Sequence, residues 1–151
     1  PWLRARAGLY RSRPAAVVLS PGPPLAAGDC LALRGNASLA LRLPSAGAAA
    51  GRLVLEQPPR WAVRKPRSAP RRFSVYGEPA AGGPGAPGAS PYGLHLGSFE
   101  YLLAAPAAQT FELAQPARLR GLQLRFHGLG WGEPYICVYR LRAYGAAALP
   151  A

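Results

Sequence analysis

Residues 131 to 145 read Trp131-Gly-Glu-Pro-Tyr-Ile-Cys-Val-Tyr-Arg-Leu-Arg-Ala-Tyr-Gly145, a stretch that joins a turn, a strand and one of the chain's two cysteines. From Tyr135 onward, the β-branched and aromatic content predicts a strand with one buried face. Gly132 and Pro134 favour a turn that leads into this strand. We therefore expect a fold built on strands, with a cysteine inside one of them.

The composition limits what such a strand can belong to. At 151 residues the chain is about the size of one domain. No stretch approaches the roughly 20 consecutive apolar residues of a membrane-spanning helix, so we expect none within it. The chain has 18 basic and 6 acidic residues, a formal net charge of +12, which ordinarily favours nucleic acid or another anionic partner.

The nature of the basic residues argues against nucleic acid. All of them are Arg except Lys65, and Ala, Gly and Pro are abundant as well. These four residue types share GC-rich codons, so base composition alone would raise the Arg content. The Arg runs do not alternate with a series of stacking aromatic residues, as a groove for single-stranded nucleic acid would need. We expect no nucleic-acid partner.

The two cysteines are too far apart in sequence for a CxxC metal or redox motif, and with only two His in the chain we expect no zinc site. A pair is favoured: if both cysteines lie on strands of one sandwich, they could form a disulfide, which implies an oxidising compartment. Asn36-Ala37-Ser38 is an N-glycosylation sequon, which fits the same compartment.

Alternation of apolar and polar residues predicts a series of short strands. Besides the strand from Tyr135, they are the runs 15–20, 39–43, 53–56, 73–77, 94–101, 109–113 and 119–126. Residues 46–51 predict a turn, so run 53–56 should pair with the preceding run as a hairpin. Residues 57–72, with four prolines, predict a loop without regular structure, either an ordered functional loop or a solvated one. The Gly/Pro/Ala segment 79–92 predicts a disordered loop. Strands with long loops and no helical period indicate a β-sandwich over 15–146, with a basic tail at 1–14 and a short tail at 147–151.

The residues that could carry catalysis are few. There is one Asp, the five Glu are scattered singly, and no Ser-His-Asp or Cys-His grouping is evident. His95 lies between two leucines and His127 at the end of a predicted strand, positions that are typical of structural histidines. We predict that the protein is not an enzyme and needs no cofactor.

Several short motifs resemble the SUN domain in order and approximate spacing, over about residues 15 to 145. They are Gly28-Asp29-Cys30, Leu55-Glu56, Ser68-Ala-Pro-Arg-Arg-Phe-Ser-Val-Tyr-Gly77, Leu96-Gly-Ser-Phe99, Gln109-Thr-Phe111, and Trp131-Gly132 through Tyr135-Ile-Cys-Val-Tyr-Arg140. The ending Arg140-Leu-Arg-Ala-Tyr-Gly145 and the Gln57-Pro-Pro59 turn are most similar to the sperm-associated members of the family.

The resemblance implies a fold, a partner and a location. The fold is an all-β sandwich, jelly-roll or galactose-binding-like, of about eight or more short strands without substantial helix. Family members are usually homotrimers above a coiled coil and bind the C-terminal peptide of a KASH protein in the perinuclear lumen. The two proteins together form the LINC complex, which links the nucleus to the cytoskeleton; a sperm-associated member would act in spermatid nuclear shaping. The membrane anchor and coiled coil would lie outside this chain, so we expect a monomer here.

Site residues are implied by the same matches. Cys30 and Cys137 match the family's disulfide pair. Ser68 and Tyr135 match the groups that hold the terminal carboxylate of the KASH peptide, and Gln57 replaces a family histidine beside them. Hydroxyl groups are neutral donors, so they can bind a carboxylate without the desolvation cost of a buried cation.

Some residues depart from the family pattern. The loop before Cys30 is about two residues longer, and it normally binds a monovalent cation; Asp29 and Tyr139 are the candidate residues for that cation here. Residues 1–14 do not resemble the hairpin that clamps the KASH peptide and are either a basic tail or its degenerate remnant. The alternative function is a secreted or lumenal glycan-binding sandwich, in which Trp61, Trp131 and nearby Arg would form a sugar platform.

Overall fold

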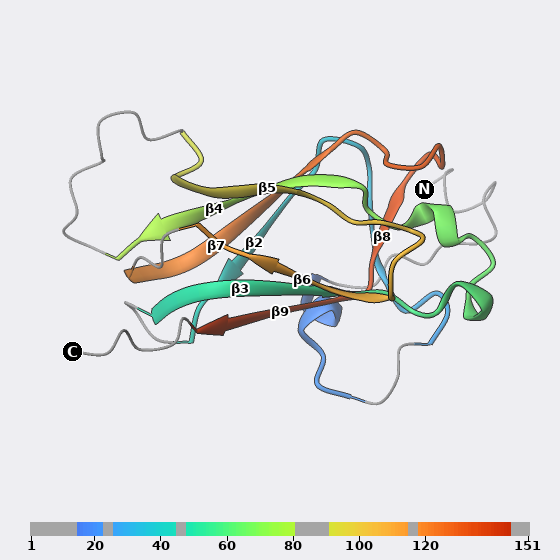
Figure 1. The fold of residues 1–151 in the computed structure, drawn as a ribbon, viewed down its shortest axis with the longest axis horizontal. Helices are drawn as coiled ribbons and strands as arrows, with labels where there is room; N and C mark the ends of the chain where they lie inside the picture. The colour runs from blue at the N-terminus through green and yellow to red at the C-terminus, as the bar shows by residue number, and fades with distance from the viewer. Residues whose placement is uncertain (1–14, 23–25, 45–47, 81–90, 115–117, 146–151) are drawn as a thin grey trace.

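The computed structural model describes residues 15–22, 26–44, 48–80, 91–114 and 118–145. In these ranges, nine strands and three short 3-10 helices follow one another (Figure 1): η1 (Ala15–Leu19), β1 (Leu31–Leu33), β2 (Ser38–Arg42), β3 (Ala48–Glu56), η2 (Arg60–Ala62), η3 (Pro66–Ser68), β4 (Arg72–Pro79), β5 (Leu94–Glu100), β6 (Ala108–Glu112), β7 (Arg118–His127), β8 (Ile136–Val138) and β9 (Arg140–Gly145). The predicted all-β sandwich without substantial helix is confirmed over these residues. The predicted tails at 1–14 and 147–151 and most of the predicted loop at 79–92 lie outside them.

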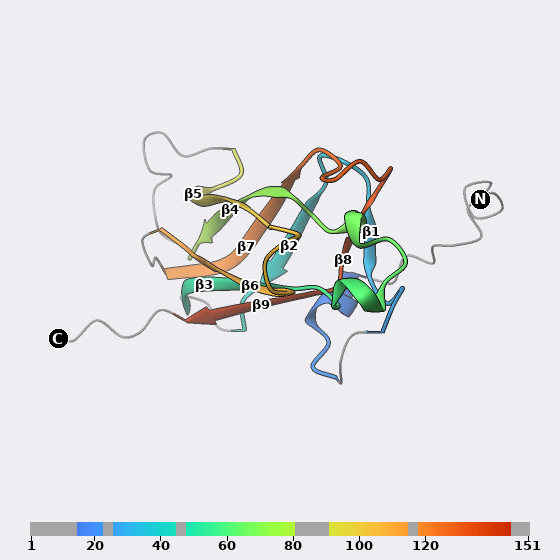
Figure 2. The same cartoon turned by 45° about the vertical axis from the view of Figure 1, so that its right-hand side comes forward.

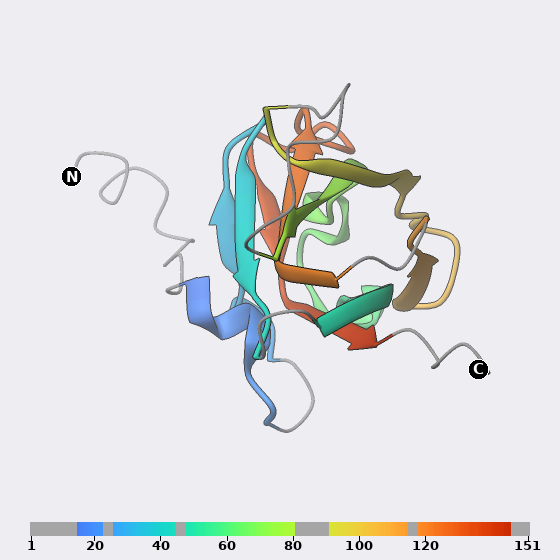
Figure 3. The ribbon, with the colours of Figure 1, turned by 90° about the vertical axis from the view of Figure 1, so that its left-hand side faces the viewer.

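Two antiparallel layers face each other, as the end-on view shows (Figure 3). One layer has the strand order β5-β4-β7-β2, and the other has β6-β3-β9. The layers are joined where the first residues of β3, Ala48 and Ala49, pair with Leu119 and Arg118 of β7. After that short pairing, β3 continues into the second layer.

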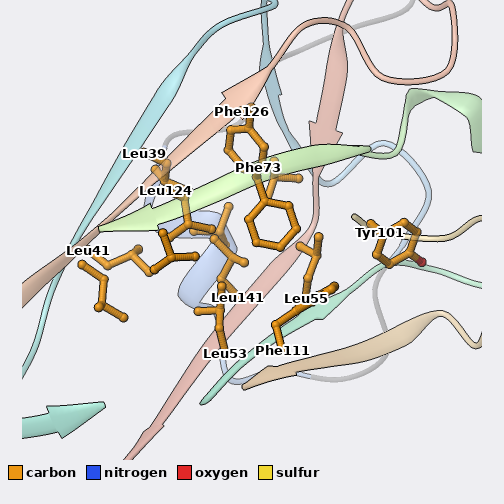
Figure 4. Close-up of a cluster of buried hydrophobic side chains, with 14 of the residues drawn as sticks. Leu39, Leu41, Leu53, Leu55, Phe73, Tyr101, Phe111, Leu124, Phe126 and Leu141 are labelled. Atoms are coloured by element: carbon orange, nitrogen blue, oxygen red, sulfur yellow. The ribbon is translucent and has the colours of Figure 1, made fainter. Parts of the chain in front are cut away.

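The core fills the space between the layers (Figure 4). Strand alternation produces it: in β2, Leu39 and Leu41 are buried while their neighbours are exposed. Phe73 of β4 is fully buried and contacts the ring of Phe111 from the opposite layer edge-on, with 5.0 Å between the centroids. The remaining core side chains labelled in the figure are Leu53, Leu55, Leu124, Phe126, Leu141 and Tyr101.

A separate two-stranded ribbon, β1-β8, closes one end of the sandwich (Figure 2). The single strand predicted from Tyr135 is therefore wrong: it divides at Tyr139 into β8, which pairs with β1, and β9, which pairs with β3. All residues from 136 to 141 are buried rather than alternate ones. The reason is that this segment passes from the ribbon into the second layer, so both of its sides are covered.

Three other sequence predictions are wrong. Residues 15–19 form η1 rather than a strand, with only Val18 buried, because this segment contributes one side chain to the core beside β9. The predicted hairpin between runs 39–43 and 53–56 does not form: β2 pairs with β7, and β3 with β6 and β9. Alternation shows which side chains face the core but not which strand lies next. The predicted turn at 46–51 is also wrong, because β3 already begins at Ala48. The remaining predicted strands are confirmed, and the predicted loop is irregular from 57 to 71 apart from η2 and η3, with β4 beginning at Arg72.

Candidate functional site

A pocket of about 310 Å³ lies beside the loop that follows β3. This loop carries η2 and η3, which lie near β8 at one end of the sandwich (Figure 2). The loop contributes one wall, and the connection between β5 and β6 contributes the other. The lining residues are Gln57, Pro58, Pro59, Arg60, Val63, Lys65, Pro66, Ser68, Ala69, Tyr101, Leu103, Ala105, Ala107 and Tyr139. Prolines and alanines make most of the pocket lining apolar, while Arg60 and Lys65 supply positive charge. Such a lining suits a small, partly apolar group that carries negative charge.

Gln57 lines this pocket and is buried, and its amide has two backbone partners. Its Nε2 donates to the carbonyl oxygen of Cys137 at 2.8 Å, and its Oε1 accepts from the backbone N–H of Tyr139 at 3.0 Å. The two bonds span the break between β8 and β9. Gln57 thus takes the place of a neighbouring strand and holds Tyr139 in the pocket wall, a role that the sequence did not reveal.

Ser68 lies at the end of η3 and is also buried. Its hydroxyl donates to the carbonyl oxygen of Lys65 at 2.7 Å. A hydroxyl has one proton, so Ser68 must rotate away from Lys65 before it can donate to a ligand. The backbone of this turn is retained in that case, because the N–H of Ser68 also donates to the Lys65 carbonyl.

Tyr135 is not among the residues that line the pocket. Its ring is partly buried against the cluster of Cys30, Cys137 and Tyr139. Lys65 links it to the pocket: the Lys65 Nζ lies 6.0 Å from the centre of the Tyr135 ring, while Lys65 itself lines the pocket. The structure therefore brings Gln57 and Ser68 together and places Tyr135 one side chain away.

Lys65 and Tyr101 are two of the pocket residues that were not predicted from the sequence. Lys65, the only Lys in the chain, forms an ion pair of 3.4 Å with Glu133, and its uniqueness was the one available signal. Tyr101 donates to the carbonyl oxygen of Ala107 at 2.9 Å, and burial raises the pKa of Tyr101 to about 12. Its hydroxyl is therefore neutral at physiological pH. No sequence pattern marked Tyr101 as a pocket residue. The pocket exists only because the fold brings the connection between β5 and β6 close to the loop that contains Gln57.

The two cysteines form a disulfide beside the pocket. Cys30 and Cys137 are both fully buried, and their Cα atoms are 5.4 Å apart. The candidate cation residues lie next to them: the Tyr139 hydroxyl accepts from the backbone N–H of Gly28, adjacent to Asp29. No cluster of three or more His, Cys, Asp or Glu side chains suited to a metal ion occurs among the described residues.

The glycosylation sequon lies at the turn between β1 and β2. Asn36 is exposed and has a positive φ of 59°, which Asn tolerates better than most residues. Its Oδ1 accepts from the backbone N–H of Gly128 at 3.1 Å, so the side-chain nitrogen is the atom left for a glycan.

The two tryptophans of the predicted sugar platform have different surroundings. One face of the Trp131 ring is covered by the Arg71 guanidinium, 4.5 Å from the ring centre, and Arg71 also bonds to Glu100 at 2.8 Å. That hydrogen bond lowers the pKa of the exposed Glu100 carboxyl. Trp61 in η2 is 88% exposed. Of these two tryptophans, only Trp61 thus offers an open ring.

Comparisons with known proteins identify a family and a fold. The family model described as Sad1 / UNC-like C-terminal matches residues 9–147. A search of curated proteins found no match. No described helix is long and apolar enough to span a membrane.

Three solved structures share the architecture. The family 32 carbohydrate-binding module of Streptococcus pneumoniae EndoD has 14% identity and a TM-score of 0.63, over 87% of this chain and 85% of that one. The family 32 module of AlyQ in complex with 4,5-unsaturated mannuronic acid has 8% identity and a TM-score of 0.60, over 87% and 86%. A pectin-binding module has 15% identity and a TM-score of 0.58, over 90% and 83%. At these identities the similarity shows the fold alone, and it confirms the predicted galactose-binding-like sandwich.

Proposed function

The chain belongs to the Sad1 / UNC-like C-terminal family, the SUN domains, and on this premise we propose that it binds the C-terminal tail of a KASH protein. The observation that supports the proposal is the pocket in which Gln57 and Ser68, both matched to the family's peptide site, lie on one wall. Lys65 lines the same pocket, and its Nζ, which pairs with Glu133 at 3.4 Å and lies 6.0 Å from the centre of the Tyr135 ring, would share its charge with a bound carboxylate. Recognition then combines hydroxyl donors with one nearby cation rather than hydroxyl donors alone.

The role is one of binding, and it takes place in an oxidising compartment. We place the domain in the perinuclear lumen, anchored at the inner nuclear membrane by a segment upstream of this chain, and the Cys30–Cys137 disulfide supports that location. The full-length protein would be a homotrimer that links the nucleus to the cytoskeleton. The similarity of residues 140–145 to sperm-associated members supports a role in spermatid nuclear shaping.

The proposed binding of a KASH tail is tested by changing how the terminal carboxylate of the peptide is recognised. Tyr135→Phe should weaken binding of a KASH-tail peptide about ten- to hundredfold, because a hydrogen bond to a charged group typically contributes about 1.5 to 3 kcal/mol. The ring still packs on the disulfide, so the fold should be unchanged. Adding one residue to the end of the peptide should abolish binding, since the carboxylate would no longer lie at the site. Calorimetric titration of both proteins with both peptides measures these effects.

Tyr144→Phe is the matched control, because Tyr144 is a partly exposed tyrosine on β9 that contacts Arg52 instead of the pocket. It should bind as the wild type does. Equal affinity in all combinations of Tyr135→Phe, wild type, native peptide and extended peptide would mean that the carboxylate is not recognised here. The glycan-binding alternative, which the open Trp61 ring favours, would then be preferred.

This chain by itself is expected to be monomeric at micromolar concentration, because it contains no heptad repeat. Its exposed large apolar side chains in the described ranges come from separate segments and are Leu19, Trp61, Tyr92, Leu102, Leu129 and Tyr144. Scattered single side chains of this kind are normal for a monomer surface. Light scattering coupled to gel filtration measures the mass; a stable trimer of this chain alone would contradict the prediction.

A further inference from the structure

The loop at residues 57–72 contains six basic residues and no acidic one. Three of the six have acidic neighbours: Lys65 pairs with Glu133, Arg71 pairs with Glu100, and the charge of Arg72 also acts on Glu100. The other three are Arg60, Arg64 and Arg67. None of these three forms an ion pair with a residue that the structure describes. The loop thus presents positive charge that nothing in the described part of the fold neutralises.

Trp61 stands among these arginines. It follows Arg60 in η2 and is 88% exposed, the most exposed large apolar side chain of the described residues. Pro59 precedes η2 and, with Arg60, lines the pocket, so the charged loop continues directly from the pocket wall. Tryptophan and arginine are the residues most enriched where a few side chains provide most of the binding energy of an interface. We call Arg60, Trp61, Arg64 and Arg67 the Trp61 ridge.

We infer that the Trp61 ridge binds an acidic, extended peptide segment that lies just upstream of the carboxylate held in the pocket. The inference rests on the proposed function and specifies its partner: a tail with a free carboxyl end preceded by Asp or Glu. An extended chain advances about 3.3 Å per residue, so side chains only a few residues before the end reach η2 from the pocket. Arg64 and Arg67 pair with the acidic side chains, and the Trp61 ring covers the peptide between them.

Other anionic partners fit the ridge less well. Single-stranded nucleic acid is bound by several aromatic side chains along a basic groove, whereas this loop has one tryptophan and adjoins a pocket lined by prolines and alanines. An anionic membrane surface would use the charge and the tryptophan but would leave the pocket unused. A peptide tail uses both.

The test employs two synthetic tail peptides of equal length, one with glutamate at its upstream positions and one with glutamine there. The double variant Arg64→Gln, Arg67→Gln should bind the glutamate peptide about two- to thirtyfold more weakly at low salt, and the glutamine peptide as the wild type does. Trp61→Ala should weaken both peptides by about tenfold or more. Arg60 is left intact because it also lines the pocket.

Arg42→Gln and Leu19→Ala are the controls, because Arg42 is an exposed arginine on β2 and Leu19 is 54% exposed on η1. Neither should alter affinity for either peptide. Circular dichroism and the thermal midpoint should match the wild type for every variant, since all the substituted side chains are exposed.

Amidated versions of both peptides separate this inference from the proposed function. One outcome is that amidation abolishes binding while the double variant Arg64→Gln, Arg67→Gln and the variant Trp61→Ala bind both peptides normally. The inference that the Trp61 ridge binds the peptide is then wrong, and the proposed carboxylate site is supported. The opposite outcome is that the double variant Arg64→Gln, Arg67→Gln loses the preference for the glutamate peptide while amidation has no effect. Binding of acidic peptide by the Trp61 ridge is then supported, and the proposed carboxylate site is wrong. Vesicles containing phosphatidylserine and a short DNA strand serve as rival ligands; loss of binding to either of them in Trp61→Ala, without a peptide effect, would overturn the inference.

Discussion

Reducing the Cys30–Cys137 bond should lower the free energy of unfolding by about 4 to 5 kcal/mol, the largest single effect expected for this chain. The bond closes a loop across a sequence separation of 107 residues, so its loss restores much conformational freedom to the unfolded state. Domains of this size are typically stable by about 5 to 15 kcal/mol. The reduced protein should therefore lie close to its unfolding limit. Urea unfolding of the oxidised and the reduced wild type measures the difference without substituting any residue.

The double variant Cys30→Ala, Cys137→Ala is the control for this experiment. Both cysteines are fully buried, so the variant loses packing as well as the bond, and its stability should equal or fall below that of the reduced wild type. The reductant should have no effect on it. A difference below about 1 kcal/mol between oxidised and reduced wild type would contradict the prediction.

The sequence predicted the fold class well because the core is built from alternation. In β2 and β7, leucines and Phe126 recur at every second position over most of their length, a pattern that only a strand with one buried face satisfies. The errors arose where that rule does not apply. Residues 136–141 are buried on both sides, η1 buries one side chain, and β3 changes layer after two residues of pairing with β7. Those features depend on contacts between distant segments, which periodicity does not record.

The site was predictable only in part. The family motifs located Gln57 and Ser68, and the structure places both in one pocket wall. The motifs did not show that the Ser68 proton is used by the Lys65 carbonyl, or that Lys65 reaches Tyr135. The opposite wall, with Tyr101, comes from the connection between β5 and β6, far from these motifs in sequence. Local motifs identify one side of a pocket, whereas the other side requires the tertiary fold.

Gln57 carries the second large expected effect. Gln57→Met keeps the length and volume of the side chain but leaves the Cys137 carbonyl and the Tyr139 N–H without the partner that the amide provides. A buried polar group that loses its partner costs about 1 to 3 kcal/mol. Two such groups should therefore lower the free energy of unfolding by roughly 2 to 5 kcal/mol, as urea unfolding would show. The N–H of Tyr139 should also exchange with solvent faster than in the wild type.

Gln109 provides a matched control for Gln57. Its Oε1 accepts from the backbone N–H of Leu102 at 3.0 Å, and its Nε2 donates to the carbonyl oxygens of Leu102 at 2.7 Å and Pro106 at 3.0 Å, all in an exposed setting. Water can replace these bonds there, so Gln109→Met should cost only about 0.5 to 1.5 kcal/mol. Equal losses in the two variants would mean that burial of the Gln57 bridge is irrelevant. A large loss for Gln57→Met alone, together with weaker binding of the KASH-tail peptide, would show that the bridge across the break between β8 and β9 holds Tyr139 in the pocket wall.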